Sequence, residues 1–179
     1  MPIRAATPTD AAAIATVHVD SWRTTYAHLL PTAYLAALSY ADRERMWRDI
    51  LAQPTPSHCV YVAEAADQRV VGFAAGGPAR DELMGYDAAL YAIYLLAPYQ
   101  RQGFGRHLLR AVVGHLQATG AHALLVWVAA HNPARAFYER LGGRQLSAKQ
   151  SDIGGVTLEE VAYGWEDLAQ LASALTLGG

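Results

Sequence analysis

The chain has 179 residues, of which 53% are hydrophobic and 17% are charged, and its formal net charge is -2. This length suits one domain with a hydrophobic core. The composition excludes a disordered polyelectrolyte and a protein that attracts nucleic acid through its overall charge.

The single cysteine, Cys59, excludes an internal disulfide and fits a reducing compartment, so we expect a cytoplasmic protein. The N-terminus lacks the pattern of a signal peptide. The longest strongly apolar run, at residues 123–130, is too short to span a membrane. The seven histidines are scattered and form no Cys/His cluster, so no metal site is expected.

The first third of the chain predicts a short strand followed by helices. Residues 2–6 form the strand candidate, and an apolar stripe that includes Ile14 predicts an amphipathic helix after Pro8. A second helical region covers residues 32–51 and is expected to break near Ser39.

The middle of the chain predicts three strands and a helix. Residues 58–65 and 69–77 are β-rich runs separated by a short loop, which indicates an antiparallel hairpin. A further strand at residues 90–96 leads directly into the stretch QRQGFGRHLLR, residues 100–110. From Gly105 onward, apolar residues recur at helical spacing. The glycines and arginines of this stretch therefore lie in a strand-to-helix turn.

The last part of the chain continues this α/β alternation. The pattern predicts a buried strand, a helix, two strands and a terminal helix at residues 123–128, 133–141, 144–150, 158–165 and 166–177. Asn132 is the expected N-cap of the first of these helices, and Gly142 and Gly143 are expected to end it.

The strand-to-helix turn has the composition of an anion site. A helix start leaves backbone N–H groups unpaired and carries partial positive charge, and the absence of Cβ at Gly103 and Gly105 lets phosphate approach the main chain. Arg101 and Arg106 add positive charge. A dinucleotide motif is excluded by Leu108 at its third glycine position, and no Gly-Lys-Ser/Thr tripeptide of a P-loop occurs. A plain turn with solvated arginines stays an alternative.

The surviving pattern, Gln100-x-x-Gly103-x-Gly105 between a strand and a helix, resembles the cofactor loop of the GNAT superfamily of N-acetyltransferases. NPARAFYERLGG, residues 132–143, resembles the second signature of that family. The match covers about residues 60–165 and is weaker over the first 55 residues. It implies an α/β acyl-CoA N-acyltransferase fold, with a mostly antiparallel twisted sheet that is splayed at the cofactor site and flanked by helices.

The resemblance also implies one domain over residues 1–179, with a cofactor-binding core at about 60–165 and acceptor-side helices at about 8–52. Acetyl-CoA would be the co-substrate and no metal would be needed. A backbone N–H of Leu95 or Leu96 would donate to the thioester carbonyl. The implied cofactor-binding residues are Tyr94, Leu95, Leu96, Gln100, Arg101, Gln102, Gly103, Phe104, Gly105, Arg106 and Asn132.

Two catalytic roles follow from the resemblance. Tyr138 is the expected general acid for the departing thiolate, with a core tyrosine as the alternative. A carboxylate before the cofactor loop would be the base; the candidates are Asp81, Glu82 and Asp87, of which Asp87 is chosen. Asn132 lies six positions before Tyr138 instead of the usual seven, so it either contacts the cofactor or only caps the helix.

Trp22, Tyr26 and Tyr91 are the expected acceptor-binding residues, because the family places its first helices beside the acceptor. Aromatic faces there would favour an amine with an apolar or cationic body. Alternatively, these rings anchor a helix to the sheet.

The expected reaction is direct transfer of acetyl from acetyl-CoA to the primary amine of a small molecule. The alternatives are acetylation of a protein N-terminus or lysine, and a non-catalytic acyl-CoA-binding sensor that would not need Tyr138. The expected partner is a small amine, without nucleic acid or membrane, and a homodimer stays open.

Overall fold

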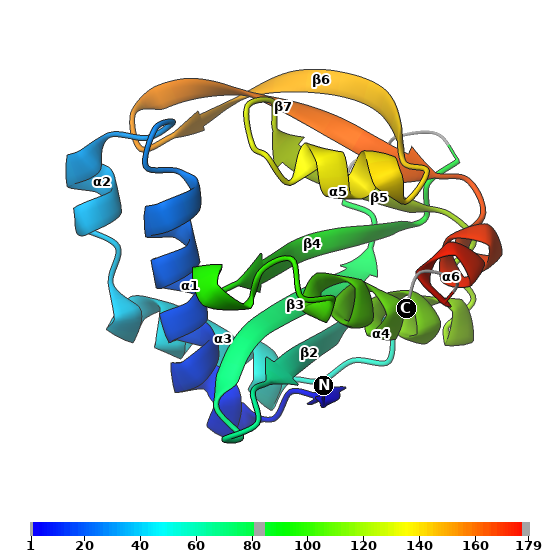
Figure 1. Cartoon of the computed structure of the whole chain (residues 1–179), viewed down its shortest axis with the longest axis horizontal. Helices are drawn as coiled ribbons and strands as arrows, with labels where there is room; N and C mark the ends of the chain where they lie inside the picture. The colour runs from blue at the N-terminus through cyan, green and yellow to red at the C-terminus, as the bar shows by residue number, and fades with distance from the viewer. Residues whose placement is uncertain (1, 81–84, 177–179) are drawn as a thin grey trace.

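A seven-stranded sheet organises the computed structural model, which describes residues 2–80 and 85–176. The strand order is β1-β2-β3-β4-β5-β7-β6 (Figure 1), and every neighbouring pair is antiparallel except β4 and β5, which are parallel. The strands are β1 (Ile3–Ala5), β2 (Cys59–Glu64), β3 (Val70–Pro78), β4 (Ala88–Leu95), β5 (Leu124–Ala129), β6 (Arg144–Ile153) and β7 (Val156–Trp165).

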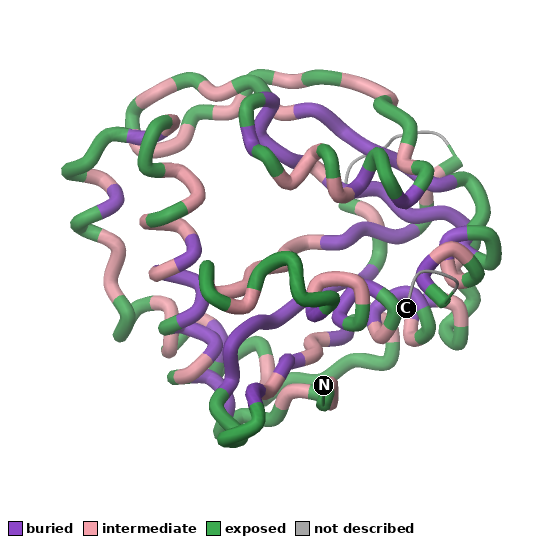
Figure 2. Tube along the Cα trace, in the orientation of Figure 1, coloured by how far each residue is buried: buried purple, intermediate pink, exposed green. Residues whose placement is uncertain are grey.

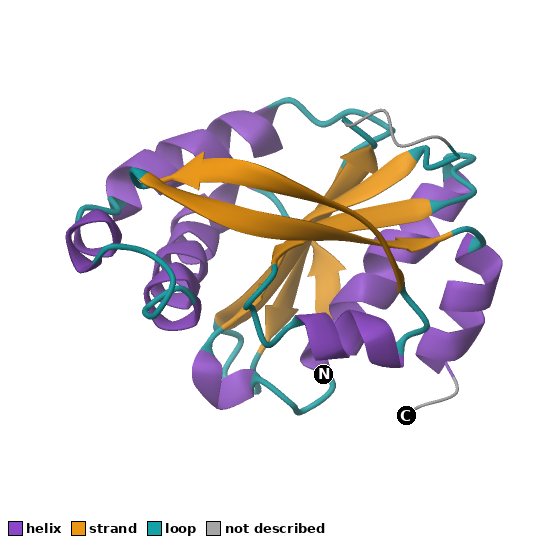
Figure 3. Ribbon diagram, turned by 90° about the horizontal axis from the view of Figure 1, so that it is seen from above, coloured by secondary structure: helices purple, strands orange, loops and turns teal. Residues whose placement is uncertain are grey.

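Helices cover both faces of this sheet (Figure 3). The α-helices are α1 (Ala11–Thr25), α2 (Thr32–Ala36), α3 (Tyr40–Ala52), α4 (Phe104–Ala118), α5 (Arg135–Arg140) and α6 (Leu168–Thr176), and short 3-10 turns lie at η1 (Pro8–Asp10) and η2 (Ala97–Tyr99). Ile14 of α1 and Trp47 of α3 are buried against Phe73 on one face, whereas Leu108 and Leu109 of α4 are buried on the other. The predicted fold class is confirmed.

The last two strands are longer than the sequence pattern predicts. They are joined only by Gly154 and Gly155, whose φ angles of 61° and 79° lie in the left-handed region that glycine adopts without strain. This tight hairpin arches over to α2 (Figure 1), where a Cβ on Gly154 would lie 2.6 Å from Cγ of Tyr34. The tip of the β6–β7 hairpin thus packs on the N-terminal helices.

The sheet is splayed between β4 and β5. These strands pair only from Ala88 to Leu90, opposite Leu124 to Val126, and diverge beyond that point. Accordingly, β4 is buried over its first three residues and half-buried over the other five (Figure 2). The open edge lies where the resemblance predicts the cofactor.

A β-bulge in β4 sets which side chains face each side of the splay. Leu90 pairs with Gly76 and Ala92 pairs with Ala75, so Tyr91 is an additional residue in the ladder. After the bulge, Tyr94 packs toward the α1 face, and the next residue, Leu95, packs toward the α4 face.

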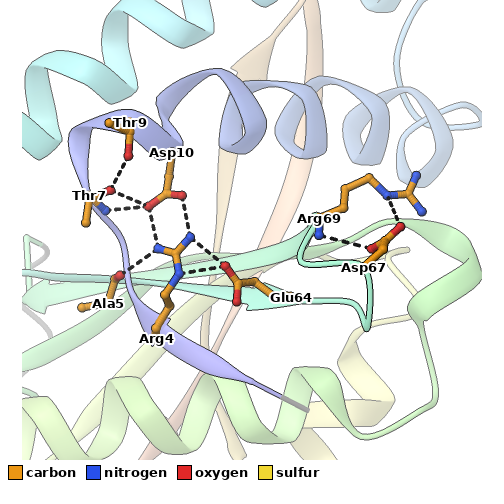
Figure 4. A network of polar contacts seen from close by, with 8 residues as sticks. All are labelled: Arg4, Ala5, Thr7, Thr9, Asp10, Glu64, Asp67 and Arg69. Carbon is orange, nitrogen blue, oxygen red and sulfur yellow. Dashed lines mark hydrogen bonds and ion pairs between the residues drawn. The ribbon is translucent and has the colours of Figure 1, made fainter.

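An ion network fixes the beginning of the chain to the sheet (Figure 4). The Arg4 guanidinium donates to both carboxylate oxygens of Asp10, at 2.8 Å each, and to Oε1 of Glu64 at 2.8 Å. Asp10 also accepts the backbone N–H of Thr7 at 2.7 Å. The hydrogen bond from Arg4 lowers the pKa of Asp10 to about 2 against the opposing effect of burial.

Replacing Asp10 by Asn should lower the free energy of unfolding by about 2 kcal/mol at neutral pH, because the buried side chain loses a charge-assisted bond. Since the folded pKa is lowered, this contribution is fully present above the ordinary value of 3.8 and disappears as the pH falls through about 2. Urea titrations of both proteins at decreasing pH measure the difference.

Asp42→Asn is the matched control, because Asp42 forms only an exposed ion pair with Arg45 and should change stability by less than about 0.5 kcal/mol. If the difference in stability between wild type and Asp10→Asn were as large at pH 2 as at neutral pH, the ionised Asp10 would not be its source.

Candidate active site

The end of β4 presents the backbone amide of Leu95 to the splay. The N–H of Leu96 donates to the carbonyl of Val71 on β3 at 2.9 Å. Because hydrogen-bond direction alternates along a strand, the main chain of Leu95 faces the other way, into the gap toward β5. The Leu95 carbonyl accepts Nε2 of Gln100 at 3.0 Å and Oγ of Ser21 at 3.3 Å. Of the two amides expected to bind the thioester carbonyl, only that of Leu95 points into the gap.

The loop before α4 exposes a cluster of amides. Gly103 is the N-cap of α4 with a φ of 89°, a left-handed conformation that favours glycine. The His107 N–H donates back to the Gly103 carbonyl at 3.1 Å. The amides of Phe104, Gly105 and Arg106 precede it and have no partner within the helix, as at any helix start. These amides and the helix dipole suit a phosphate group.

Gly105 borders the space between β4 and α5. A Cβ at this position would lie 3.6 Å from Cδ1 of Leu95 and 3.8 Å from Cζ of Phe137. The missing side chain therefore leaves room beside the Leu95 side chain, at the end of β4.

Three loop side chains bind the protein itself. The Arg106 guanidinium donates to the carbonyls of Ala174 and Leu175, at the C-terminal end of α6. The expectation that this guanidinium adds charge to the loop is therefore wrong, because it stabilises the negative end of another helix. Gln102 Nε2 donates to the Pro98 carbonyl at 2.6 Å, and Gln100 Nε2 donates to the Leu95 carbonyl. Both glutamines fix the loop conformation.

Tyr94 is held by a buried aromatic stack. His18 of α1 stacks on its ring with centroids 5.4 Å apart. Nε1 of Trp47 donates to Nδ1 of His18 at 3.1 Å, and burial lowers the pKa of His18 to about 4. The neutral imidazole thus connects α1 and α3 with β4 without adding charge near the site.

Polar side chains from three elements meet at the splay. Tyr26 follows α1, and its hydroxyl interacts with the side chains of Tyr94 on β4 and Asn132 before α5. Tyr138 of α5 is 4% exposed and packs against the rings of Tyr163 and Trp165.

Burial raises the pKa of Tyr138, and the Tyr26 hydroxyl raises it further. Tyr138 therefore keeps its proton at neutral pH.

Helix α5 begins at Arg135 with Ala134 as its N-cap, so the predicted N-cap position of Asn132 is wrong by two residues. Asn132 Oδ1 instead accepts the N–H of Ala134 at 2.9 Å in the turn before α5, and the side chain also reaches Tyr26. A contact between Asn132 and the cofactor stays a prediction.

A pocket of about 300 Å³ lies on the α1 side of the splay, between β4, β5 and the β6–β7 hairpin. All three predicted acceptor residues line it: Trp22, Tyr26 and Tyr91. The indole N–H of Trp22 is buried without a hydrogen-bond partner in the described structure, although it lies near the Tyr94 hydroxyl. The remaining lining residues are Arg80, Ala89, Leu90, Tyr94, Leu125, Trp127, Ala129, Ile153, Leu158 and Glu160.

Two charged residues of this pocket were missed from the sequence. Glu160 on β7 accepts the Ser151 hydroxyl, and the Arg80 guanidinium lies 4.1 Å from the ring centroid of Tyr91. The signal for Glu160 was its position two residues from Leu158 and Ala162 in a strand, which places a carboxylate on an apolar face. No comparable sequence signal marks Arg80.

The geometry does not support Asp87 as the base. Its carboxylate accepts the backbone N–H groups of His122 at 3.0 Å and Ala123 at 2.9 Å, at the start of β5, and it does not line the pocket. Burial acts to raise the pKa of Asp87, but these amide bonds outweigh it and lower the pKa. Asp87 therefore has a structural role, binding backbone amides just before β5. Asp81 and Glu82 lie outside the described residues.

The described part of the chain gives little support for a nucleophilic cysteine or a metal site. Burial raises the pKa of the Cys59 thiol to about 11, which makes it a poor nucleophile. Over residues 2–80 and 85–176, His, Cys, Asp and Glu form no group of three that could hold a metal ion. None of the helices in these residues has the length and apolar character needed to cross a bilayer.

Comparisons with known proteins agree with this architecture. Residues 19–143 match the model of the Acetyltransferase (GNAT) family. Over 173 residues, 97% of each chain, the protein is 42% identical to the uncharacterized N-acetyltransferase YuaI of Bacillus subtilis (strain 168). Over 85 residues, 48% of this chain and 55% of the relative, it is 31% identical to the [ribosomal protein bS18]-alanine N-acetyltransferase of Haemophilus influenzae.

Solved structures share the fold. The PaiA N-acetyltransferase of Thermoplasma acidophilum, in complex with coenzyme A, is 18% identical with a TM-score of 0.68, covering 89% of this chain and 96% of its own. The putative acetyltransferase YncA of Salmonella typhimurium, with acetyl-CoA, is 19% identical with a TM-score of 0.68 and covers 94% of each chain. The chain therefore belongs to the GNAT family and is an N-acetyltransferase.

Proposed function

We propose that this enzyme transfers the acetyl group of acetyl-CoA to the primary amine of a small molecule bound in the 300 Å³ pocket. The observation that carries this proposal is the position of β4. On one face, Leu95 lies beside Gly105 at the amide-rich start of α4; on the other, Tyr91 and Tyr94 line the pocket. A donor at α4 and an acceptor in the pocket would meet at the splay.

The residues at α4 fit coenzyme A. The amides of Phe104, Gly105 and Arg106 would bind the pyrophosphate, and the space beside Gly105 would admit the pantetheine arm. Bound acetyl-CoA would supply an acetyl group activated as a thioester. The Leu95 N–H would donate to the carbonyl oxygen, on which negative charge develops during the attack.

Two side chains would move the protons. The Glu160 carboxylate accepts a proton from the amine, and the Tyr138 hydroxyl donates one to the departing thiolate. Support for Tyr138 comes from its place on α5 near the Tyr26 hydroxyl; burial raises its pKa, so the hydroxyl is protonated at neutral pH. Support for Glu160 comes from its position in the pocket and its electrostatic effect on Tyr26.

The hairpin favours a small acceptor over a protein. Its tip at Gly154 packs on Tyr34, and Ile153 and Leu158 of the hairpin line the pocket, so the hairpin closes one side of it. The match to a ribosomal-protein acetyltransferase, which covers less than half of this chain, supports a peptide N-terminus as the second candidate.

Replacing Trp22 by Ala should raise the KM of the best amine from an acceptor panel about tenfold and change the KM of acetyl-CoA less than about twofold, because Trp22 lines the pocket proposed for the acceptor. Initial rates, measured as free CoA thiol, give both constants. Trp22→Phe keeps an aromatic face and serves as the matched control, with a smaller rise.

Equal effects on both KM values would instead mean that Trp22 anchors α1 to the sheet. A preference for peptides ending in a free amine over every small amine would favour the second candidate.

A further inference from the structure

The acceptor pocket contains two opposite charges that do not pair with each other. Within residues 2–80 and 85–176, neither Arg80 nor Glu160 takes part in an ion pair. Arg80 lies over the ring of Tyr91, and Glu160 accepts the Ser151 hydroxyl. Lys149, across the strand pair from Glu160, directs its ammonium to the Trp127 ring, 4.0 Å from the centroid.

These charges lie at different parts of the pocket. Glu160 acts electrostatically on the Tyr26 hydroxyl, which in turn acts on Tyr138, so Glu160 belongs to the end where acetyl transfer would occur. Arg80 is stacked on Tyr91, the bulged residue of β4. Apolar side chains, including Leu125 and Leu158, also line the pocket.

Each charge has a definite preference in a ligand. A half-buried carboxylate favours an ammonium group, because a counter-charge offsets the cost of removing it from water. A guanidinium held on an aromatic ring presents its planar donors to a carboxylate or phosphoryl group. A volume of about 300 Å³ suits a molecule of amino-acid size.

We propose that the acceptor is a zwitterion of amino-acid size, whose primary amine binds at Glu160 and whose anionic group binds at Arg80. The inference rests on the proposed function and narrows its substrate class. It differs from a simple amine and from a peptide N-terminus, because neither places a negative group near its amine.

The test compares matched acceptors that differ only in the anionic group: aliphatic and aromatic amino acids, their primary amides, the decarboxylated amines and the corresponding aminophosphonates. The wild-type kcat/KM should be about tenfold or more higher for the amino acid or the aminophosphonate than for the amide. Comparison of the amino acid with the aminophosphonate then identifies whether a carboxylate or a phosphonate is preferred.

Arg80→Gln should remove this preference, because it should raise the KM of the acid about tenfold and leave the KM of the amide unchanged. Arg80→Glu should reverse it, so that diamines become better acceptors than amino acids. Because Arg80 is exposed, both variants should fold, which thermal melting checks. Arg45→Gln, which removes a charge from exposed α3, is the control that should change no preference.

Failure of the inference and failure of the proposed function give different results. Equal rates for acids and amides in wild type and in Arg80→Gln would overturn the proposal that the acceptor is a zwitterion. The proposed acetylation of small amines would still stand. Acetyl-CoA binding without acetylation of any small amine would overturn the proposed function itself.

Discussion

Replacing Tyr138 by phenylalanine should lower kcat about 100-fold or more and leave the affinity for acetyl-CoA nearly unchanged. The substitution removes only the hydroxyl from a ring that is 4% exposed and packed on Trp165 and Tyr163, so the fold should be retained. The rate should fall because no protonated hydroxyl remains to neutralise the departing thiolate. Steady-state rates and calorimetric titration with acetyl-CoA measure the two quantities.

Tyr163→Phe is the matched control for this variant. Tyr163 belongs to the same ring cluster, but its hydroxyl bonds to Glu139 and Arg135 and not to groups of the splay. Its loss should leave kcat within about twofold of wild type. Full activity in Tyr138→Phe would assign Tyr138 a packing role and remove it from the reaction.

Replacing Gly105 by valine should weaken acetyl-CoA binding about tenfold or more and leave the thermal stability close to wild type. The new Cβ would make ordinary contacts with Leu95 and Phe137, so the protein can accommodate it, but the added methyl groups would enter the space proposed for the cofactor beside these two side chains. Calorimetric titration measures the affinity.

Gly114→Val in the same helix is the control, because a Cβ there meets no atom within 4 Å. It should bind acetyl-CoA as wild type does. If both valine variants bound equally well, the cofactor could not pass between β4 and the start of α5.

Local patterns in the sequence were sufficient to predict most elements and the turn before α4, whose binding of a cofactor stays a prediction. Helices α1, α3 and α4 have apolar stripes, and Ser39 and Gly103 lie at the helix starts as N-caps. The loop could be predicted because its glycines and the helix start are neighbours in the chain. Trp22, Tyr26 and Tyr91 were predicted to lie together and do line one pocket, and their contact with the acceptor stays a prediction.

The missed features depend on contacts between distant segments. No local pattern shows that Arg106 reaches the end of α6, or that Asp87 accepts amides at the start of β5. Glu160 reaches the pocket only because β7 pairs with β5, more than 30 residues earlier in the chain. The choice between the amides of Leu95 and Leu96 required the pairing of β4 with β3.

The bulge at Tyr91 sets which side chains of β4 face each of the two proposed substrates. Side chains alternate along a regular strand, so pairing without the bulge would turn every later residue of β4 to the opposite face. Tyr94 would then face α4 and Leu95 would face the pocket, which would put an apolar group where the acceptor enters. Deleting Tyr91 would keep the orientation of the following residues and remove only one wall of the pocket. Acceptor preference can therefore be redesigned at this position while the register of the donor-facing residues is kept.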